Sequence, residues 1–189
     1  MASMHGQVAI VTGGTQGLGA AIAATLAQRG ALGVVICGRN ATKGAGQVEL
    51  LNALGTQALY VQADLEKVDD CRRVVQQTDA RFGRVDVLVN AAALTDRGTI
   101  LDTDPALFDR MFAVNVRAPF YLMQESILVM KRESIEGRIV NIGSMSALAG
   151  QPFIAAYCAS KGALATLTRN TAYALLYNRI RVNALNIGW

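Results

Sequence analysis

The sequence predicts an α/β protein in which a doubly wound parallel sheet has helices on both of its faces. Short apolar runs that are typical of buried strands alternate with longer stretches in which apolar residues recur at helical spacing. A glycine-rich turn separates the first of these strands from the first helix. Parallel strands need a crossover connection, and the alternation supplies one. No linker or low-complexity segment interrupts the chain, so we expect a single domain over residues 1–189.

The individual elements follow from the apolar runs and from the residues that begin or end helices. In the first βαβ unit, strands at 7–11 and 34–37 flank a helix at 15–27 that ends near Gly30. Asp104 and Pro105 are suited to the N-cap and the first position of a helix, and they predict a helix from 104 to about 131. The remaining strands are expected at 58–61, 85–89, 138–142 and 180–185, and the remaining helices at 42–54, 68–82 and 155–177.

Composition excludes several classes of function. No apolar run approaches the ~20 residues of a membrane span and the first residues do not resemble a signal peptide, so we expect a cytoplasmic protein without membrane contact. Cys37, Cys71 and Cys158 are widely spaced and His5 is the single histidine, so neither a disulfide framework nor a metal site is predicted. The net charge of +4 is mild and its residues are scattered, which argues against nucleic-acid binding.

The glycine-rich turn after the first strand indicates a dinucleotide site. Glycines permit a tight turn and a close approach of the backbone to a phosphate, and the N-terminus of the following helix supplies unpaired N–H groups and a positive dipole end. A plain connecting turn is the alternative, but the position at the start of a βαβ unit favours dinucleotide binding. The predicted contacts are Gly13, Thr15, Gln16, Gly17, Leu18 and Gly19.

The end of the second strand indicates which dinucleotide is bound. Many NAD sites carry an acidic residue there, which holds the ribose hydroxyls and would repel a 2′-phosphate. Here the residue is Arg39, whose guanidinium can form two parallel hydrogen bonds with a phosphate. NADP(H) is therefore preferred, with NAD(H) also allowed, and a solvated loop arginine is the alternative. After the third strand, Asp64 and Leu65 are expected to meet the adenine amine, although Asp64 could equally begin a helix.

Tyr157 and Lys161 lie four residues apart in a predicted helix, which places them on one face. A free tyrosine side chain has a pKa of ~10, so proton transfer near neutral pH requires its anion to be stabilised. A lysine cation one helical turn away can do this. For this motif alone, an exposed pair on a helix surface is the alternative.

Four motifs together resemble the short-chain dehydrogenase/reductase family. The stretch Thr12 to Gly19 matches the family's T-G-x-x-x-G-x-G cofactor turn, and Tyr157 with Lys161 matches its Y-x-x-x-K. Ser144 matches the serine thirteen residues before that tyrosine, and Asn115 is similar to the family's fourth catalytic residue. The resemblance covers essentially the whole chain and implies the Rossmann-type form of the predicted fold.

The resemblance implies a hydride transfer between NADP(H) and a small-molecule carbonyl or secondary alcohol. In this reading Tyr157 is the proton donor and acceptor, and Ser144 hydrogen-bonds the same substrate oxygen. Lys161 favours the phenolate of Tyr157 and binds the nicotinamide ribose, so both residues also belong to the cofactor site. Asn115 anchors a water that links Lys161 to solvent. No metal is required.

The sequence departs from the family pattern at two places. The family's N-N-A-G is present as Asn90-Ala91-Ala92-Ala93, where Asn90, Ala91 and Ala92 are expected to offer mainly backbone to the cofactor. Its later P-G is present as Ile187-Gly188, which we also expect at the cofactor. Members of the family ordinarily continue into a substrate lid and a last strand. Both are absent from these 189 residues, and we expect residues to follow Trp189.

The resemblance also implies a homodimer or homotetramer built on the helices at 104–131 and 155–177. A non-catalytic nucleotide-binding regulatory or scaffold protein of the same fold is the rival function. The complete set of Asn115, Ser144, Tyr157 and Lys161 argues against it, because a pure binder needs no proton donor. The sequence leaves the substrate and the physiological direction of reaction open.

Overall fold

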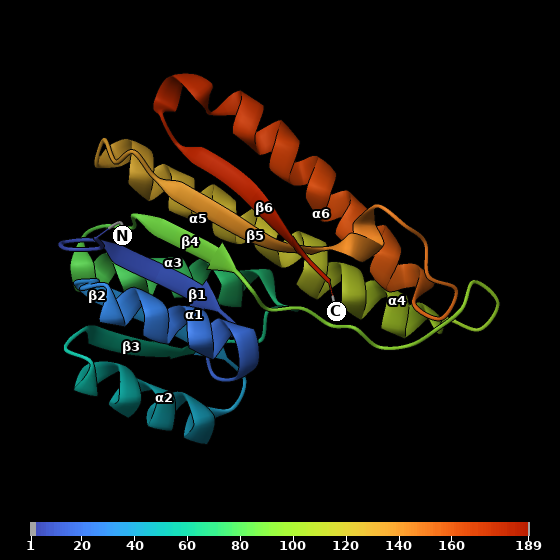
Figure 1. Cartoon of the computed structure of the whole chain (residues 1–189), viewed down its shortest axis with the longest axis horizontal. Helices are drawn as coiled ribbons and strands as arrows, with labels where there is room; N and C mark the ends of the chain where they lie inside the picture. Colours follow the sequence, from blue (N-terminus) through green and yellow to red (C-terminus); the bar gives the residue numbers. More distant parts are fainter. Residues whose placement is uncertain (1–2, 189) are drawn as a thin grey trace.

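The computed structural model describes residues 3–188, which form one six-stranded sheet flanked by helices (Figure 1). The strands are β1 (Val8–Thr12), β2 (Gly33–Gly38), β3 (Gln57–Gln62), β4 (Val87–Asn90), β5 (Arg138–Ser144) and β6 (Arg181–Ile187). Their order in space is β3-β2-β1-β4-β5-β6, and all neighbouring pairs are parallel. This confirms the predicted doubly wound fold. The order reverses between β1 and β4, where open α/β sheets bind ligands.

Helices cover both faces of the sheet and create two hydrophobic clusters. The main helices are α1 (Gly17–Gln28), α2 (Ala41–Ala53), α3 (Val68–Phe82), α4 (Pro105–Phe112), α5 (Ala118–Arg132) and α6 (Ala155–Ala174). Helices α1 and α2 pack on one face, and α3, α5 and the end of α6 pack on the other (Figure 1). Because both faces are covered, the central strands are almost entirely apolar, as in β1. None of the helices within residues 3–188 combines the length and apolar character that crossing a membrane requires.

Most predicted elements are present, with differences at their ends. Helix α3 has the predicted bounds. Helix α1 begins at Gly17 instead of residue 15, because Gly13 and Gly17 adopt positive φ angles of 66° and 55° and extend the turn. Strand β4 begins two residues later than predicted, since the Asp86 carboxylate before it accepts a hydrogen bond from the Val8 N–H at 2.8 Å.

The long helix predicted from 104 to about 131 is divided by a π-helical turn. Asp104 caps its start by accepting hydrogen bonds from two backbone N–H groups, as predicted. The π-helical turn, Ala113–Arg117, separates α4 from α5 and contains the buried Asn115. Such turns are frequent at functional sites. Two short 3₁₀ turns, Met145–Ala147 and Leu176–Asn178, follow β5 and α6.

Candidate active site

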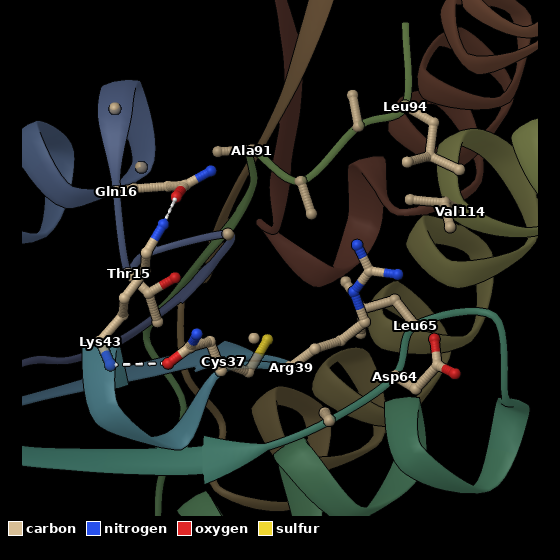
Figure 2. Close-up of a pocket in the computed structure, with 18 of the residues that line it drawn as sticks. Thr15, Gln16, Cys37, Arg39, Lys43, Asp64, Leu65, Ala91, Leu94 and Val114 are labelled. Atoms are coloured by element: carbon tan, nitrogen blue, oxygen red, sulfur yellow. Dashed lines mark hydrogen bonds between the residues drawn. The ribbon is translucent and has the colours of Figure 1, made fainter. Parts of the chain in front are cut away.

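A cavity of about 510 Å³ lies beyond the carboxyl ends of β1 to β4 (Figure 2). This is the edge of the sheet at which the sequence predicts the dinucleotide. Most of the predicted cofactor contacts line it, which brings together residues from four separate connections. They are Gly13, Thr15, Gln16, Gly17, Leu18, Gly19, Arg39, Asp64, Leu65, Ala91 and Ala92.

The glycine-rich turn is as compact as its composition suggests. A Cβ atom on Gly19 would lie 2.4 Å from the Gly13 carbonyl oxygen, and one on Gly13 would lie 3.1 Å from the Cα of Ala92. No side chain caps the N-terminus of α1, and no acidic residue lies in its first turn. The first N–H groups of α1 and the positive end of its dipole can therefore bind an anion at the cavity. These features fit the phosphates of a dinucleotide.

Thr12 joins this turn to the segment after β4. Its buried hydroxyl accepts hydrogen bonds from the N–H groups of Ala91 and Ala92, each at 3.0 Å. These bonds place the Ala91–Ala92 backbone in the wall of the cavity, as the sequence predicts. Sequence analysis placed Thr12 in the cofactor-turn motif but not among the predicted contacts, although a hydroxyl at the last position of a buried strand indicates a role at the strand end.

Two cations, from the end of β2 and the start of α2, line the cavity. The exposed Arg39 extends its guanidinium into the cavity from the end of β2 (Figure 2). Lys43, in the first turn of α2, also lines the cavity, and its Nζ donates to Gln16 Oε1 at 2.7 Å. Asn40 caps α2 by accepting the Lys43 N–H at 2.9 Å. The sequence analysis missed Lys43, although a second basic residue four positions after Arg39 could have indicated a second cation at this site.

Asp64 lies at the opposite wall, where its groups also serve the local turn. Its N–H donates to Asp70 Oδ2 at 2.7 Å, and its Oδ1 accepts the Glu66 N–H at 3.2 Å. Lys67 occupies the N-cap position of α3 without a side-chain hydrogen bond, so Asp64 is not the helix-start residue of the alternative reading. Cys37 lines the cavity too, but burial raises the pKa of its thiol to about 12, so the thiol is neutral.

Five of the predicted cofactor residues do not line the cavity, namely Asn90, Tyr157, Lys161, Ile187 and Gly188. The side chain of Asn90 is buried and donates from Nδ2 to Asn141 Oδ1 on the neighbouring strand at 2.8 Å. It therefore supports the sheet from beneath the site. Ile187 and Gly188 lie exposed at the end of β6, close to the 3₁₀ turn that follows β5. A Cβ on Gly188 would lie 3.4 Å from the Cγ of Met145 in that turn.

Tyr157 and Lys161 share the buried face of α6, which contradicts the reading of an exposed surface pair. The two residues are only 9% and 3% exposed. Lys161 Nζ lies 5.6 Å from the centre of the Tyr157 ring and donates to the Ile142 carbonyl oxygen on β5 at 2.8 Å. Ser144, at the end of the same strand, is buried and accepts the Ser146 N–H at 3.1 Å. Its own hydroxyl hydrogen can then be donated to a ligand.

Asn115 connects the π-helical turn to two other parts of the site. Its Oδ1 accepts the Leu94 N–H at 2.8 Å, and its Nδ2 donates to the Leu94 carbonyl at 2.9 Å and to Ser160 Oγ at 3.0 Å. Both amide hydrogens are thus used, so a water at this residue would have to be held by an oxygen atom. Ser160, which the sequence analysis missed, donates in turn to the Tyr157 carbonyl at 2.8 Å.

Burial sets the electrostatics of Lys161. Removal from water lowers the pKa of its ammonium group from 10.5 to about 8. The group therefore still carries a positive charge at neutral pH. The Ile142 carbonyl and the Tyr157 ring face are the neighbours that stabilise this charge in the interior.

Comparisons with known proteins agree with this geometry. The family model of the short chain dehydrogenases matches residues 7–189. An uncharacterized oxidoreductase of Thermotoga maritima is 38% identical over 183 residues, which are 97% of this chain and 71% of the relative. Two solved structures bind different nicotinamide cofactors. The blue fluorescent protein from a metagenomic library, in complex with NADPH, has a TM-score of 0.90 at 36% identity and covers 98% of this chain and 75% of its own. NAD⁺-bound xylitol dehydrogenase has a TM-score of 0.94 at 29% identity. The match covers 100% of this chain and 72% of the xylitol dehydrogenase chain.

The burial of Lys161 predicts a pH dependence of stability. The folded chain binds the Lys161 proton more weakly than the unfolded chain, so stability should rise as the pH passes from about 8 to 10.5. Relative to Lys161→Met, the free energy of unfolding of the native protein should increase by up to about 3 kcal/mol across this window. Urea unfolding at both ends of the window measures it. Lys131→Met, at an exposed position of α5, should follow the native curve. Equal pH dependence in native protein and Lys161→Met would contradict the assignment.

Proposed function

The chain belongs to the short-chain dehydrogenase family, and we propose that it transfers a hydride between NADP(H) and the carbonyl or secondary alcohol group of a small molecule. Family membership makes it an oxidoreductase that acts on CH–OH and C=O groups with a nicotinamide cofactor. The observation that supports the finer proposal most directly is the buried Tyr157–Lys161 pair, whose lysine donates to the Ile142 carbonyl on β5, the strand that ends at Ser144.

Each of the three residues has a physical role in this proposal. Tyr157 gives its proton to the carbonyl oxygen during reduction and takes it back during oxidation. Ser144 donates a hydrogen bond to the same oxygen and stabilises the negative charge that develops on it. The Lys161 cation, held by the Ile142 carbonyl, favours the phenolate of Tyr157 and binds the nicotinamide ribose. The bound nicotinamide supplies or accepts the hydride itself.

Asn115 completes the set as the residue that resupplies protons. We assign it an anchored water that leads from Lys161 to solvent, as the family resemblance implies. Its side chain also ties Leu94 to Ser160, and thereby positions the segment of α6 that carries Tyr157.

NADP(H) is the proposed cofactor, since two cations meet the end of the cavity after β2. Arg39 and Lys43 would share the charge of a 2′-phosphate, and neither β2 nor the loop after it carries an acidic residue that would repel one. NAD(H) is the alternative, and similar proteins include one solved with each cofactor.

A nucleotide-binding scaffold protein is the second candidate function. Such a protein would need the cavity but not the buried Lys161 next to Tyr157. Burial of a lysine destabilises its charged form, and cofactor binding alone gives no reason to keep it.

We further propose that residues 1–189 act as one catalytic and cofactor-binding domain, supported by the single continuous sheet. A cytoplasmic location is supported by Cys37, Cys71 and Cys158, which are all free thiols.

Removal of the Tyr157 hydroxyl should separate binding from chemistry. Tyr157→Phe should lower kcat by about 10³-fold while leaving the Kd for NADPH within about twofold. The variant lacks the hydroxyl proton that is transferred, but it keeps every contact to the phosphates of the cofactor. Stopped-flow NADPH oxidation and fluorescence titration measure the two quantities. Tyr173→Phe, at an 80% exposed position of the same helix, is the matched control and should retain full activity. Comparable turnover in Tyr157→Phe would exclude the proposed proton donor, whereas cofactor binding without turnover in the native protein would favour the scaffold.

Loss of the Arg39 guanidinium should discriminate between the cofactors. Arg39→Ala should raise the Kd for NADPH at least about tenfold and that for NADH less than about twofold, because only the former carries the 2′-phosphate. Lys43→Ala should act in the same direction. Arg169→Ala, on the exposed face of α6, serves as the control. Equal losses for both cofactors would remove the case for NADP(H).

We also propose that the protein is a homodimer or homotetramer that uses α4, α5 and α6. Phe108 and Phe120 on these helices are 42% and 45% exposed, and Ala159 and Gly162 leave room on α6 for close packing. Light scattering at micromolar concentration should give at least twice the chain mass, and Phe120→Asp should shift the protein toward the monomer. Leu50→Asp on α2, 63% exposed, should not. A native monomer would refute the assembly.

A further inference from the structure

We propose that the substrate is an uncharged molecule with apolar groups on both sides of its reacting carbon, and that the site selects against carboxylate or phosphate near that carbon. The inference rests on the proposed function, because it concerns the groups around Ser144 and Tyr157. It goes further by naming the chemical class that those surroundings accept.

The segment that carries both hydroxyl groups has no charged side chain. Residues 139–160 run from β5 through the 3₁₀ turn into the first turns of α6, and they contain no Asp, Glu, Lys, Arg or His. Gln151, in the loop between the 3₁₀ turn and α6, is polar but uncharged. A substrate held over Ser144 and Tyr157 therefore meets no full charge from this segment.

The same segment exposes large apolar side chains in the stretch of chain that connects Ser144 with Tyr157. Met145 follows Ser144 directly and is 50% exposed, while Leu148 and Phe153 in the loop before Tyr157 are 69% and 66% exposed. The 3₁₀ turn that contains Met145 packs against α6. Exposed apolar groups gathered in one loop are characteristic of ligand contacts more than of a solvated turn.

The facing loop between β4 and α4 continues this apolar border. Its Leu94 packs against the hydrophobic cluster that contains Tyr157, as does Ile154 from the loop before α6. Gly98 joins the two loops, since its N–H donates to the Phe153 carbonyl at 2.9 Å and its carbonyl accepts the Ala155 N–H at 3.0 Å. Figure 1 shows these loops side by side beyond the end of the sheet.

The cation closest to the proton donor is not arranged to bind an anionic substrate. Lys161 is buried, lies against the Tyr157 ring and donates to the Ile142 carbonyl. A carboxylate placed among Met145, Leu148 and Phe153 would lose hydration without gaining a partner, whereas an apolar group would gain from leaving water. The border consequently favours uncharged ketones and their alcohols over keto acids and sugar phosphates.

Arg97 defines the competing hypothesis. It is exposed in the loop between β4 and α4, next to Gly98, whereas the neighbouring Asp96 lies 3.7 Å from Arg110. If the natural substrate were anionic, the Arg97 guanidinium would be the group to bind it. The two hypotheses differ in their expectation for Arg97→Ala.

Keto esters and their parent keto acids test the proposal, since each ester removes the charge and adds only one methyl group. The pairs are methyl levulinate with levulinate, and methyl 5-oxohexanoate with 5-oxohexanoate, in which at least two methylene groups separate the charge from the ketone, so that it alters the ketone's reactivity little. In NADPH oxidation, each ester should have a kcat/KM at least about tenfold higher than its acid. Arg97→Ala should leave this ratio unchanged. An acid used as well as its ester, or an ester preference abolished in Arg97→Ala, would overturn the proposal.

Insertion of a charge into the border provides a gain-of-function test. Leu148→Arg should shift the ratio toward the acids by about tenfold, because it supplies the partner that the carboxylate lacks. Leu50→Arg, at a 63% exposed position of α2, is the matched control and should leave the ratio unchanged. An unchanged ratio in a folded Leu148→Arg variant would show that Leu148 does not border the substrate.

Binding without turnover separates this inference from the proposed function. In Tyr157→Phe saturated with NADPH, calorimetry should show tighter binding of each ester than of its acid. If native protein fails to oxidise NADPH while this preference persists, the hydride-transfer proposal fails and the substrate class stands. Equal binding of ester and acid, or no binding of either, overturns the substrate class whatever the turnover.

Discussion

The hydrogen bonds of the Asn115 side chain hold together the part of the site to which we assign proton transfer. This buried amide must satisfy its own donors and acceptor, because an unpaired amide in the interior is strongly destabilising. It does so by bonding both backbone groups of Leu94 and the hydroxyl of Ser160, one residue before Lys161. The loop after β4, the π-helical turn and α6 are therefore constrained to one arrangement. The π-helical turn is the local irregularity that places this side chain between them.

The cofactor half of the site is held by close backbone contacts instead. Glycines at 13 and 19 let the turn after β1 fold onto itself and onto the chain after β4, at separations that any Cβ atom would prevent. The Thr12 hydroxyl then joins the two segments by accepting both N–H groups of Ala91 and Ala92. The two halves meet at the segment from Ala91 to Leu94, which belongs to both. A change in this segment would thus affect cofactor position and proton transfer together.

Lys161 shows how packing and charge oppose each other in the centre of the site. Burial disfavours its ammonium form, yet the Ile142 carbonyl and the Tyr157 ring preserve a charge at neutral pH. In the mechanism that we propose, this charge would act through Tyr157 more than on the substrate directly. A low local dielectric strengthens that effect, which is the physical reason for placing a lysine where its solvation is poorest.

The sequence alone determined the alternation of strands and helices, the glycine turn, the shared face of Tyr157 and Lys161, and the cap at Asp104. These follow from local backbone geometry and from side-chain periodicity, which neighbouring residues suffice to define. Only the tertiary structure decided which distant residues bond to one another. The Ala91 N–H donates to the Thr12 hydroxyl, and Lys43 Nζ donates to the Gln16 side chain. Asn90 Nδ2 donates to Asn141 on the neighbouring strand, and Ile187 lies outside the cavity. The physical reason is that these contacts join residues far apart in the chain, whose pairing depends on strand order and on which buried polar groups can satisfy one another.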